Sequence, residues 1–470
     1  YLMGINFSRV LTLRYGNSVS HYLKTKYQAI SVGRVMTCVL GMVVRREREI
    51  RSFVKTPFYR VLGSISLEGE NFDGEWRAVE GSRYFRSPYL YKENGFKEKQ
   101  YAEKLIGELS QNSPLVCQVE KIERKKENKN PPLLFNLAEL QNVCSRLFKI
   151  SPDETLRIVQ ELYEKKLVTY PRTDARVLST AVAKEIYKNI SGLRRYPQID
   201  GAADEVLEMG TYKNIAKTRY VNDKQITDHY AIIPTGQGLS ALNGISLTAQ
   251  RVYETIVRRF LCIFYPPAVY QKVNLVTVMD KEHFFSSFRV LQSEGYLKIA
   301  ANSFAAKKAS EKSQDSEEEE NTSCNEVLLA ALQKLKKNDI LSVDSLSIKE
   351  GETSPPKRYN SGSMILAMEN AGQLIEDEEL RAQIRGSGIG TSATRAEILK
   401  KLFSIKYLSL NKKTQVITPT LLGEMIFDVV NCSIRQLLNP ELTASWEKGL
   451  TYVAEGSITP QEYMDKLEHF

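Results

Sequence analysis

The chain has 470 residues, a formal net charge of +9 and a pI near 9.0. This length is too great for one compact core and predicts about three domains, while the excess of Lys and Arg favours a polyanionic partner. The longest apolar stretch, Val35–Val44, falls well short of the ~20 residues that cross a bilayer, so no membrane partner is expected.

Cysteine usage limits the kinds of site that the chain can hold. The cysteines are scattered, and no two form a Cys-x-x-Cys pair. This pattern argues against zinc ribbons and against a secreted disulfide framework. A reducing cytoplasm is therefore the expected location. The six positions are Cys38, Cys117, Cys144, Cys262, Cys324 and Cys432.

Helical and strand-like patterns alternate along the chain. The five consecutive parts are 1–56 (helical), 57–130 (β-rich), 131–264 (helical), 265–354 (β-rich) and 355–470 (helical). The polar run Glu123–Asn130 is typical of a hinge, and the acidic, serine-rich segment 303–325 is expected to be a mobile loop. This order predicts a β-rich domain and an outer helical domain that are each entered twice, with the remaining helical domain inserted at the centre.

The segment most informative about chemistry is Leu167–Asp174, which reads Leu-Val-Thr-Tyr-Pro-Arg-Thr-Asp. It follows an expected helix with a capping pattern at Ser151–Glu154, and another helix is expected from about Ser179. Tyr170 thus lies on a turn between packed elements, a frequent place for catalytic side chains. A free phenol has a pKa near ~10 and is a poor nucleophile at neutral pH, but Arg172 offers it a permanent cation. Taken alone, the pair is equally consistent with a half-buried aromatic beside a surface arginine.

Segments that carry a wider pattern follow one another in a fixed order. They are Tyr1–Arg9, Ser31–Met36, Val44–Ile50, Pro131–Leu137, Leu162–Asp174, Thr227–Thr235, Gly388–Glu397 and Asn439–Trp446. Together these eight segments resemble type IA DNA topoisomerases, most closely the bacterial topoisomerase III branch. For example, Ser31–Met36 is similar to the family's DNA-contacting Ser-Val-Gly-Arg-Val-Gln, and Thr227–Thr235 to its Thr-Asp-His-His-Ala-Ile-Ile-Pro-Thr.

The resemblance implies a multidomain α+β ring in which helical base and cap domains are joined by β-rich arches. It also implies an activity: Tyr170 attacks a DNA phosphate, forms a 5′-phosphotyrosyl bond with a free 3′-hydroxyl, and later gives the phosphate back. Negative supercoils would be relaxed and linked duplexes separated without ATP. In agreement, the sequence has no Gly-x-x-x-x-Gly-Lys-Ser/Thr motif. The expected protein is a monomer that binds DNA, preferentially single-stranded.

Residue by residue, the resemblance assigns catalysis to Tyr170 and Arg172 and DNA contact to a further set. That set is Tyr1, Asn6, Arg9, Ser31, Val32, Gly33, Arg34, Val35, Met36, His229, Thr391, Thr394 and Arg395. Free backbone amides at an expected helix start near Thr391–Arg395 favour phosphate binding there, with outward-facing side chains.

Each of these DNA-contact assignments has a structural alternative. His229 is alternatively a packing histidine, Tyr1 a core aromatic rather than a stacking one, and Thr391–Arg395 an ordinary capped helix.

Departures from the family pattern also carry information. The family opens with a toprim domain in which a glutamate and an Asp-x-Asp-x-Asp cluster hold Mg²⁺, and nothing in this sequence resembles it. We therefore interpret the chain as lacking that domain, with Mg²⁺ expected in the full-length enzyme and no metal ligands here. Met36 and Cys38 replace the family's usual Gln and Pro, which puts the details of DNA contact there in doubt.

Three other functions are weighed against topoisomerase activity. A non-catalytic single-stranded DNA-binding ring would keep the basic groove but never cleave. A tyrosine relaxase or nuclease needs a His-x-His pair or an acidic cluster, and no such histidine pair occurs. A tyrosine recombinase needs several arginines and histidines in another order around a C-terminal tyrosine. Neither of these two enzyme classes fits the eight segments.

Overall fold

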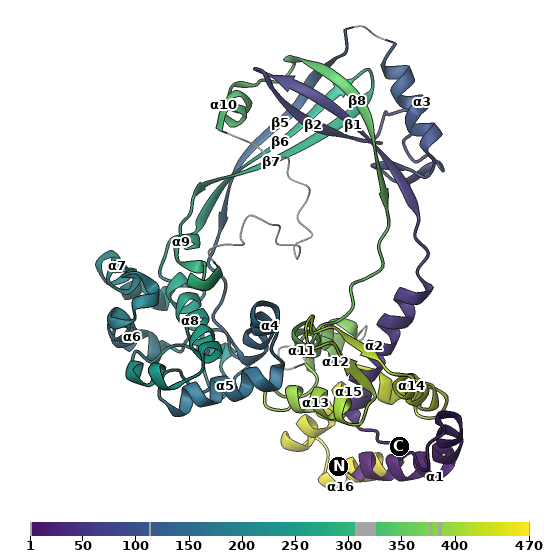
Figure 1. Cartoon of the computed structure of the whole chain (residues 1–470), viewed down its shortest axis with the longest axis vertical. Helices are drawn as coiled ribbons and strands as arrows, with labels where there is room; N and C mark the ends of the chain where they lie inside the picture. The colour runs from purple at the N-terminus through teal and green to yellow at the C-terminus, as the bar shows by residue number, and fades with distance from the viewer. Residues whose placement is uncertain (1, 112–113, 306–325, 376–377, 384–387, 470) are drawn as a thin grey trace.

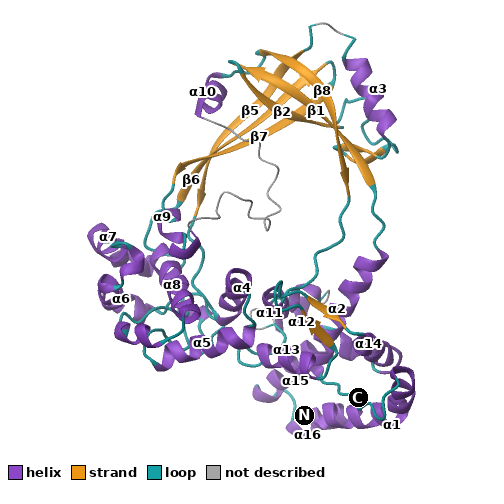
Figure 2. Ribbon diagram, in the orientation of Figure 1, coloured by secondary structure: helices purple, strands orange, loops and turns teal. Residues whose placement is uncertain are grey.

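The computed structural model describes residues 2–111, 114–305, 326–375, 378–383 and 388–469. Its helices and strands trace a ring made of three bodies (Figures 1 and 2). Long strands form the body at the top of the view, and two helical bodies lie below it. We call these bodies the barrel, the cap and the base. Each has its own cluster of buried hydrophobic side chains.

The barrel consists of antiparallel strands from distant parts of the sequence. They are β1 (Pro57–Leu67), β2 (Glu70–Arg77), β5 (Val116–Lys129), β6 (Ala268–Met279), β7 (Glu282–Ser293) and β8 (Ile340–Glu352). They are hydrogen-bonded in the order β2-β7-β6-β5-β8-β1, and β2 also pairs with β1, so the sheet closes on itself. Alternating residues face the interior, where Trp76 stacks on Phe96 with ring centroids 4.9 Å apart.

Smaller elements complete the barrel. They are β3 (Leu90–Lys92), β4 (Gly95–Phe96), α3 (Lys99–Leu109) and α10 (Glu326–Lys334). Both helices contribute apolar side chains to the barrel core, among them Leu105 and Leu332. These two helices lie within the parts of the sequence that the alternating pattern describes only as β-rich.

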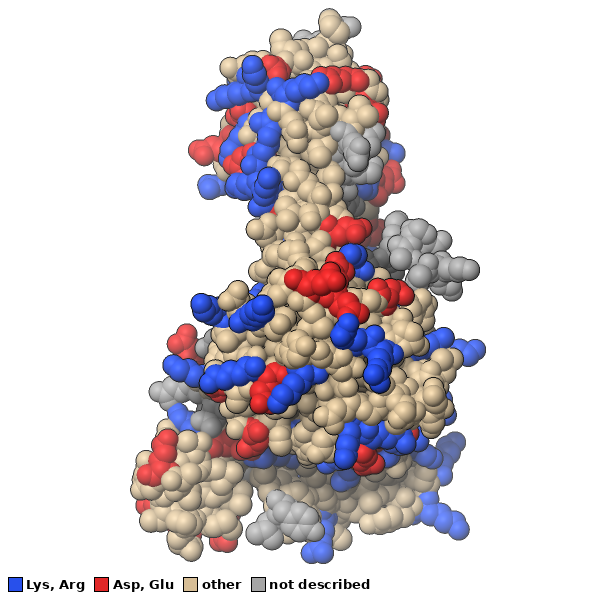
Figure 3. Space-filling model, turned by 90° about the vertical axis from the view of Figure 1, so that its left-hand side faces the viewer, with Lys and Arg blue, Asp and Glu red and all other residues tan. Residues whose placement is uncertain are grey.

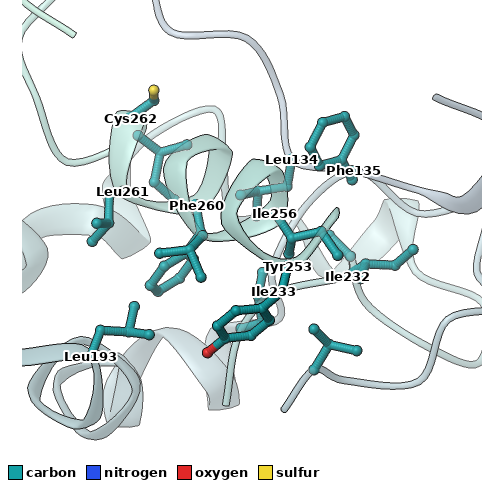
Figure 4. Close-up of a cluster of buried hydrophobic side chains, with 14 of the residues drawn as sticks. Leu134, Phe135, Leu193, Ile232, Ile233, Tyr253, Ile256, Phe260, Leu261 and Cys262 are labelled. Carbon is teal, nitrogen blue, oxygen red and sulfur yellow. The ribbon is translucent and has the colours of Figure 1, made fainter. Parts of the chain in front are cut away.

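The cap is a helical body that includes Tyr170. Its α-helices are α4 (Leu137–Phe148), α5 (Pro152–Glu164), α6 (Thr180–Gly192), α7 (Ala202–Met209), α8 (Leu247–Cys262) and α9 (Leu297–Ala300). Helix α8 is buried along most of its length, and Figure 4 shows Tyr253, Ile256 and Phe260 pointing into the cluster that it shares with its neighbours. Because an all-round buried helix fixes everything packed on it, α8 gives the tyrosine-bearing segments a rigid support.

The base combines the two ends of the chain. Its elements are α1 (Leu2–Leu23), α2 (Arg34–Ser52), α11 (Ser361–Glu369), α12 (Glu378–Gln383), α13 (Arg395–Ser404), β9 (Leu408–Leu410), β10 (Ile417–Pro419), α14 (Leu421–Ser433), α15 (Pro440–Ala454) and α16 (Pro460–His469). Residues from both ends share one hydrophobic cluster. No helix in the described part of the chain is both long and apolar enough to span a membrane.

Two pairs of strands connect the barrel to the helical bodies (Figure 1). On one side, β5 leads into the cap and β6 returns from it, and their lower ends are paired at Lys129 and Ala268. On the other side, α2 leads into β1 and β8 returns to the base, with Pro57 opposite Glu352. The cap and the base therefore hang from separate arms.

Local expectations are met in part. Ser151 caps α5 by accepting a hydrogen bond from the Glu154 N–H at 3.2 Å, and α6 follows Ser179. Two expectations were wrong in detail. The helix expected from Ser31 begins only at Arg34, because Gly33 is extended with φ −171°. The part from 355 onward, expected to be helical, also contains the β9–β10 hairpin.

The predicted mobile loop can be checked only at its start. Residues 303–305 form a short 3₁₀ turn. Residues 306–325 lie outside the described residues, so the prediction of a loop there stays a prediction.

Candidate active site

Tyr170 lies on the cap in the loop that follows α5. The preceding residues pair with the segment 231–235: the Thr169 N–H donates to the Ile233 carbonyl at 3.0 Å, and the Thr169 hydroxyl to the Ala231 carbonyl at 3.0 Å. Pro171 then turns the chain away. Tyr170 is half-buried, so its position is fixed by these pairings while part of its ring stays accessible.

His229 is the nearest aromatic neighbour of Tyr170. The two ring centroids are 4.2 Å apart, and the Tyr163 ring meets Tyr170 edge-on at 5.6 Å. The Thr173 hydroxyl donates to the His229 carbonyl at 2.8 Å, which ties the histidine segment to the tyrosine loop. The imidazole itself is exposed. The two sequence motifs that predicted catalysis and DNA contact are thus brought together.

Arg172 is exposed, and within the described residues no hydrogen bond or ion pair engages its guanidinium. A buried arginine of this kind would need a carboxylate, but an exposed one is satisfied by water and remains free to meet an anion. The arrangement Tyr170, Arg172 and His229 therefore offers a phenol, a cation and an imidazole on one accessible loop surface.

Asp174 ends the same loop and reaches the base. Its carboxylate accepts a hydrogen bond from Arg395 Nη1 at 3.0 Å. Arg395 is fully buried at 0% exposure, so it does not face outward as the sequence had suggested. In this structure Arg395 joins the base to the tyrosine loop and is not a surface cation. Thr391 and Thr394 beside it are exposed, and their hydroxyls lie 3.1 Å apart.

A second contact to the base lies beside the first. Asn136 caps α4, and its amide nitrogen donates to the Asp174 carbonyl at 3.1 Å and to Glu369 Oε1 at 2.7 Å. Burial raises the pKa of the Glu369 carboxyl, while Arg395 and the hydrogen bond from Asn136 oppose the shift. Sequence reasoning missed Asn136, Asp174 and Glu369 as individual site residues. The first two stand inside quoted motifs, whereas nothing in the sequence singles out Glu369.

The other predicted DNA-contact residues lie in the base. Asn6 and Arg9 are exposed on α1, and α1 packs on the segment before α2, where the Val32 N–H donates to the Ser8 hydroxyl at 3.0 Å. Arg34 is ion-paired with Glu447 at 2.7 Å. This brings the Tyr1–Arg9 and Ser31–Met36 motifs together.

Side chains of the segment 31–36 are only partly accessible. Val32 and Met36 are buried in the base core, so they are not accessible in this structure. Ser31, Gly33 and Val35 are half-buried, and the Ser31 N–H donates to the Tyr407 hydroxyl at 2.8 Å. Tyr1 lies outside the described residues. We find no contact in the described structure that joins this base segment to Tyr170.

A resident metal does not fit the residues at hand. Among the described residues, no group of three or more His, Cys, Asp or Glu side chains is placed to hold a metal ion. We therefore assign Mg²⁺ no ligand in this chain and derive no step through it.

The comparisons with known proteins decide the family. A family model described as DNA topoisomerase matches residues 1–465. The chain belongs to this family. It is a type IA topoisomerase of the topoisomerase III-like kind, as its relatives show. DNA topoisomerase 3 of Bacillus licheniformis is 31% identical over 475 residues, covering 100% of this chain and 58% of the relative. DNA topoisomerase 3 of Bacillus subtilis is 30% identical, again with 100% and 58% covered.

The topoisomerase fold is also found among solved structures. Full-length topoisomerase I from Thermotoga maritima matches with a TM-score of 0.63 and 22% identity, covering 98% of this chain and 66% of that one. This likeness shows the fold and confirms the predicted fold class. The topoisomerase chain described here spans less than two thirds of the length of the DNA topoisomerase 3 relatives.

Proposed function

We propose that this chain carries the DNA-cleaving and strand-passing part of a type IA topoisomerase. Tyr170 is the nucleophile and single-stranded DNA is the substrate. The observation that carries the proposal is the meeting of Tyr170, His229 and the free Arg172 on one loop surface, beside the seam between cap and base. Family membership over residues 1–465 supports the same conclusion.

The chemistry is a reversible phosphoryl transfer. The Tyr170 phenol loses its proton, and its oxygen attacks a DNA phosphorus. The new O–P bond forms as the bond to the 3′ oxygen breaks, and that oxygen takes up a proton. The product is a 5′-phosphotyrosyl bond and a free 3′-hydroxyl, which later attacks the same phosphorus and releases the phenol. The bond energy is conserved, so resealing requires no ATP.

Arg172 and His229 have distinct proposed roles. The transition state places extra negative charge on the phosphoryl oxygens, and a fixed cation aimed at them lowers the barrier. Arg172 supplies that charge because no protein group occupies it among the described residues. His229 lies against the Tyr170 ring and can donate to a phosphate or accept the phenolic proton. The exposed Thr391 and Thr394 hydroxyls lie near Asp174 and are proposed to bind a neighbouring phosphate.

Strand passage follows from the ring. A DNA end held on Tyr170 moves with the cap, whereas the other end would stay with the base. Separation of the two bodies would then open a gap in the strand through which another passes, and closing would allow resealing. Relaxation of negative supercoils and separation of linked duplexes are both outcomes of this cycle. The protein is proposed to act as a cytoplasmic monomer.

Binding to the DNA backbone is proposed to be electrostatic in large part. Figure 3 shows Lys and Arg spread over one side of the molecule and interspersed with acidic side chains. With a net charge of +9, affinity should fall steeply as salt rises, because bound phosphates release counterions. Asn6, Arg9 and the segment 31–36 are proposed to form one wall of the DNA-binding groove.

A covalent adduct tests this function. A labelled single-stranded oligonucleotide is incubated with the chain and Mg²⁺, alone and with a separately made toprim domain, and denatured samples are examined for label on the protein. We expect an adduct that is lost in Tyr170→Phe and kept in the matched control Tyr163→Phe. Binding without an adduct under either condition would favour the non-catalytic ring, which the family relatives do not favour.

A further inference from the structure

The seam between cap and base differs from the interior of either body. The cap and the base have separate hydrophobic clusters, and among the described residues Ala138 of α4 is the one cap residue in the base cluster. The direct contacts are instead polar. The Ser145 and Ser361 hydroxyls lie 3.0 Å apart, and Gln415 Nε2 donates to the Lys149 carbonyl at 3.0 Å. Polar groups regain water when they separate, so such a seam can open without exposing a core.

Two of the polar contacts converge on the end of the tyrosine loop. From the base, Arg395 binds the Asp174 side chain at 3.0 Å. From the cap, Asn136 holds the Asp174 carbonyl at 3.1 Å and extends to Glu369 of the base at 2.7 Å. Asn136 is 1% exposed and Arg395 0%. Both contacts therefore lie in the dry part of the seam, where a charge without a partner is costly.

A third cross-seam ion pair provides a natural comparison. Lys400 and Asp153 are 3.2 Å apart, but their side chains are 59% and 39% exposed. Water competes for such a pair, so its contribution is small. Closure of the seam should therefore depend on the buried contacts and not on charge pairing in general.

We propose that Asp174, Asn136, Arg395 and Glu369 form a polar latch that holds cap and base together and positions the tyrosine loop when the ring is closed. The purpose of its release, strand passage, rests on the proposed function, but the latch itself is a property of the DNA-free chain. Asp174 and Glu369 are positioning residues in this account. They act on Tyr170 through the loop and the seam.

The experiment measures the cap-to-base distance directly in the full chain without DNA. Spin labels are introduced as unnatural amino acids at the exposed Arg157 of α5 and Lys401 of α13, and pulsed electron paramagnetic resonance gives the populations of close and separated states. Three variants are compared with wild type: Asp174→Ala, Glu369→Ala and the conservative Glu369→Gln. The matched control is Asp153→Ala, which removes the exposed pair.

The latch predicts that Asp174→Ala raises the ratio of separated to closed molecules by about tenfold, because buried Arg395 loses its ion partner. Glu369→Ala should shift the ratio in the same direction, and Glu369→Gln should restore closure because its amide oxygen can still accept from Asn136. Asp153→Ala should change the ratio by less than about twofold. Circular dichroism confirms that each variant is folded. If Asp174→Ala unfolds, the two Glu369 variants decide the question.

The proposal is overturned if the Asp174 and Glu369 variants leave the ratio at the wild-type value, or if Asp153→Ala shifts it as much. This result is independent of the adduct assay. A shifted distance with no adduct would retain the latch and reject the proposed function, and an adduct with unshifted distances would do the reverse.

Discussion

The buried guanidinium of Arg395 on α13 binds the carboxylate of Asp174, four residues after Tyr170, at 3.0 Å. This contact joins a helix of the base to the loop that carries the candidate nucleophile. The chain that connects these two residues passes through both arms and the barrel. The geometry around Tyr170 therefore depends on closure of the whole ring.

Replacing Arg395 should weaken this closure and the base itself. Truncating one partner of a buried ion pair typically costs about 3–5 kcal/mol, but Asp174 is 34% exposed and can recover part of its solvation. We expect Arg395→Ala to lower the free energy of unfolding by about 2–3 kcal/mol. Urea denaturation measures this change. The exposed Lys400→Ala is the control, and an equal loss in both variants would contradict the assignment.

Glu369 should make closure depend on pH. Its pKa is raised by burial, so the folded form binds the proton more tightly than the unfolded chain does. The associated stability is complete below the ordinary pKa of 4.5 and is lost as pH rises through the higher folded pKa. Glu369→Gln should abolish this loss. Thermal unfolding of both proteins from acid to neutral pH measures it, and parallel curves would count against the shift.

Glu47 should act in the opposite direction. Its carboxylate accepts from Arg358 Nε at 2.7 Å and Nη2 at 2.9 Å, and these hydrogen bonds lower its pKa from 4.5. The resulting stability is present above that value and is lost as pH falls through the lower folded pKa.

Glu47→Gln should therefore remove part of the acid sensitivity and cost about 1–2 kcal/mol at neutral pH, with the half-exposed Arg358 limiting the effect. Glu49→Gln, in an exposed pair with Arg46, should change stability by less than about 0.5 kcal/mol. Equal acid sensitivity of Glu47→Gln and wild type would refute the prediction.

The approach of α4 to α11 should depend on Gly362. A Cβ at this position would lie 2.7 Å from Asn142 Cα and 2.9 Å from Ser145 Cβ, so Gly362→Ala forces the cap and the base apart. We expect a loss of about 1–3 kcal/mol and a longer distance between the labels on α5 and α13.

Gly107→Ala is the matched control for this substitution. Gly107 lies on α3 with open space around it, and alanine there should stabilise by up to about 1 kcal/mol. If Gly362→Ala is as stable and as closed as this control, the seam is looser than the structure shows.

Local sequence signals were sufficient for much of the catalytic loop. The capping pattern at Ser151 and the helix start at Ser179 follow from short-range hydrogen bonding, and both are found. The placement of His229 beside Tyr170 was expected only through the family resemblance, because two motifs far apart in the sequence meet through long-range strand-like pairing. That meeting is a tertiary contact, which periodicity does not encode.

The seam is the part that the sequence could not predict. An arginine near a helix start is ordinarily exposed, and its burial here depends on Asp174 arriving from another body. Glu369 is one of many acidic residues on helices, and only packing against Asn136 distinguishes it. In the same way, Gly33 allows the chain before α2 to extend, whereas an apolar pattern through Val32 and Met36 suggested a longer helix.

The measurement that tests the central claim most directly identifies the residue that holds the DNA. The adduct is trapped by denaturant with Mg²⁺ and the toprim domain present, digested with trypsin and analysed by tandem mass spectrometry. Cleavage after Lys166 and Arg172 gives the peptide Leu167–Arg172, in which Tyr170 is the only tyrosine. We predict that this peptide carries the oligonucleotide 5′-phosphate. Phosphate on any other peptide, including the one that contains Tyr163, would contradict the account.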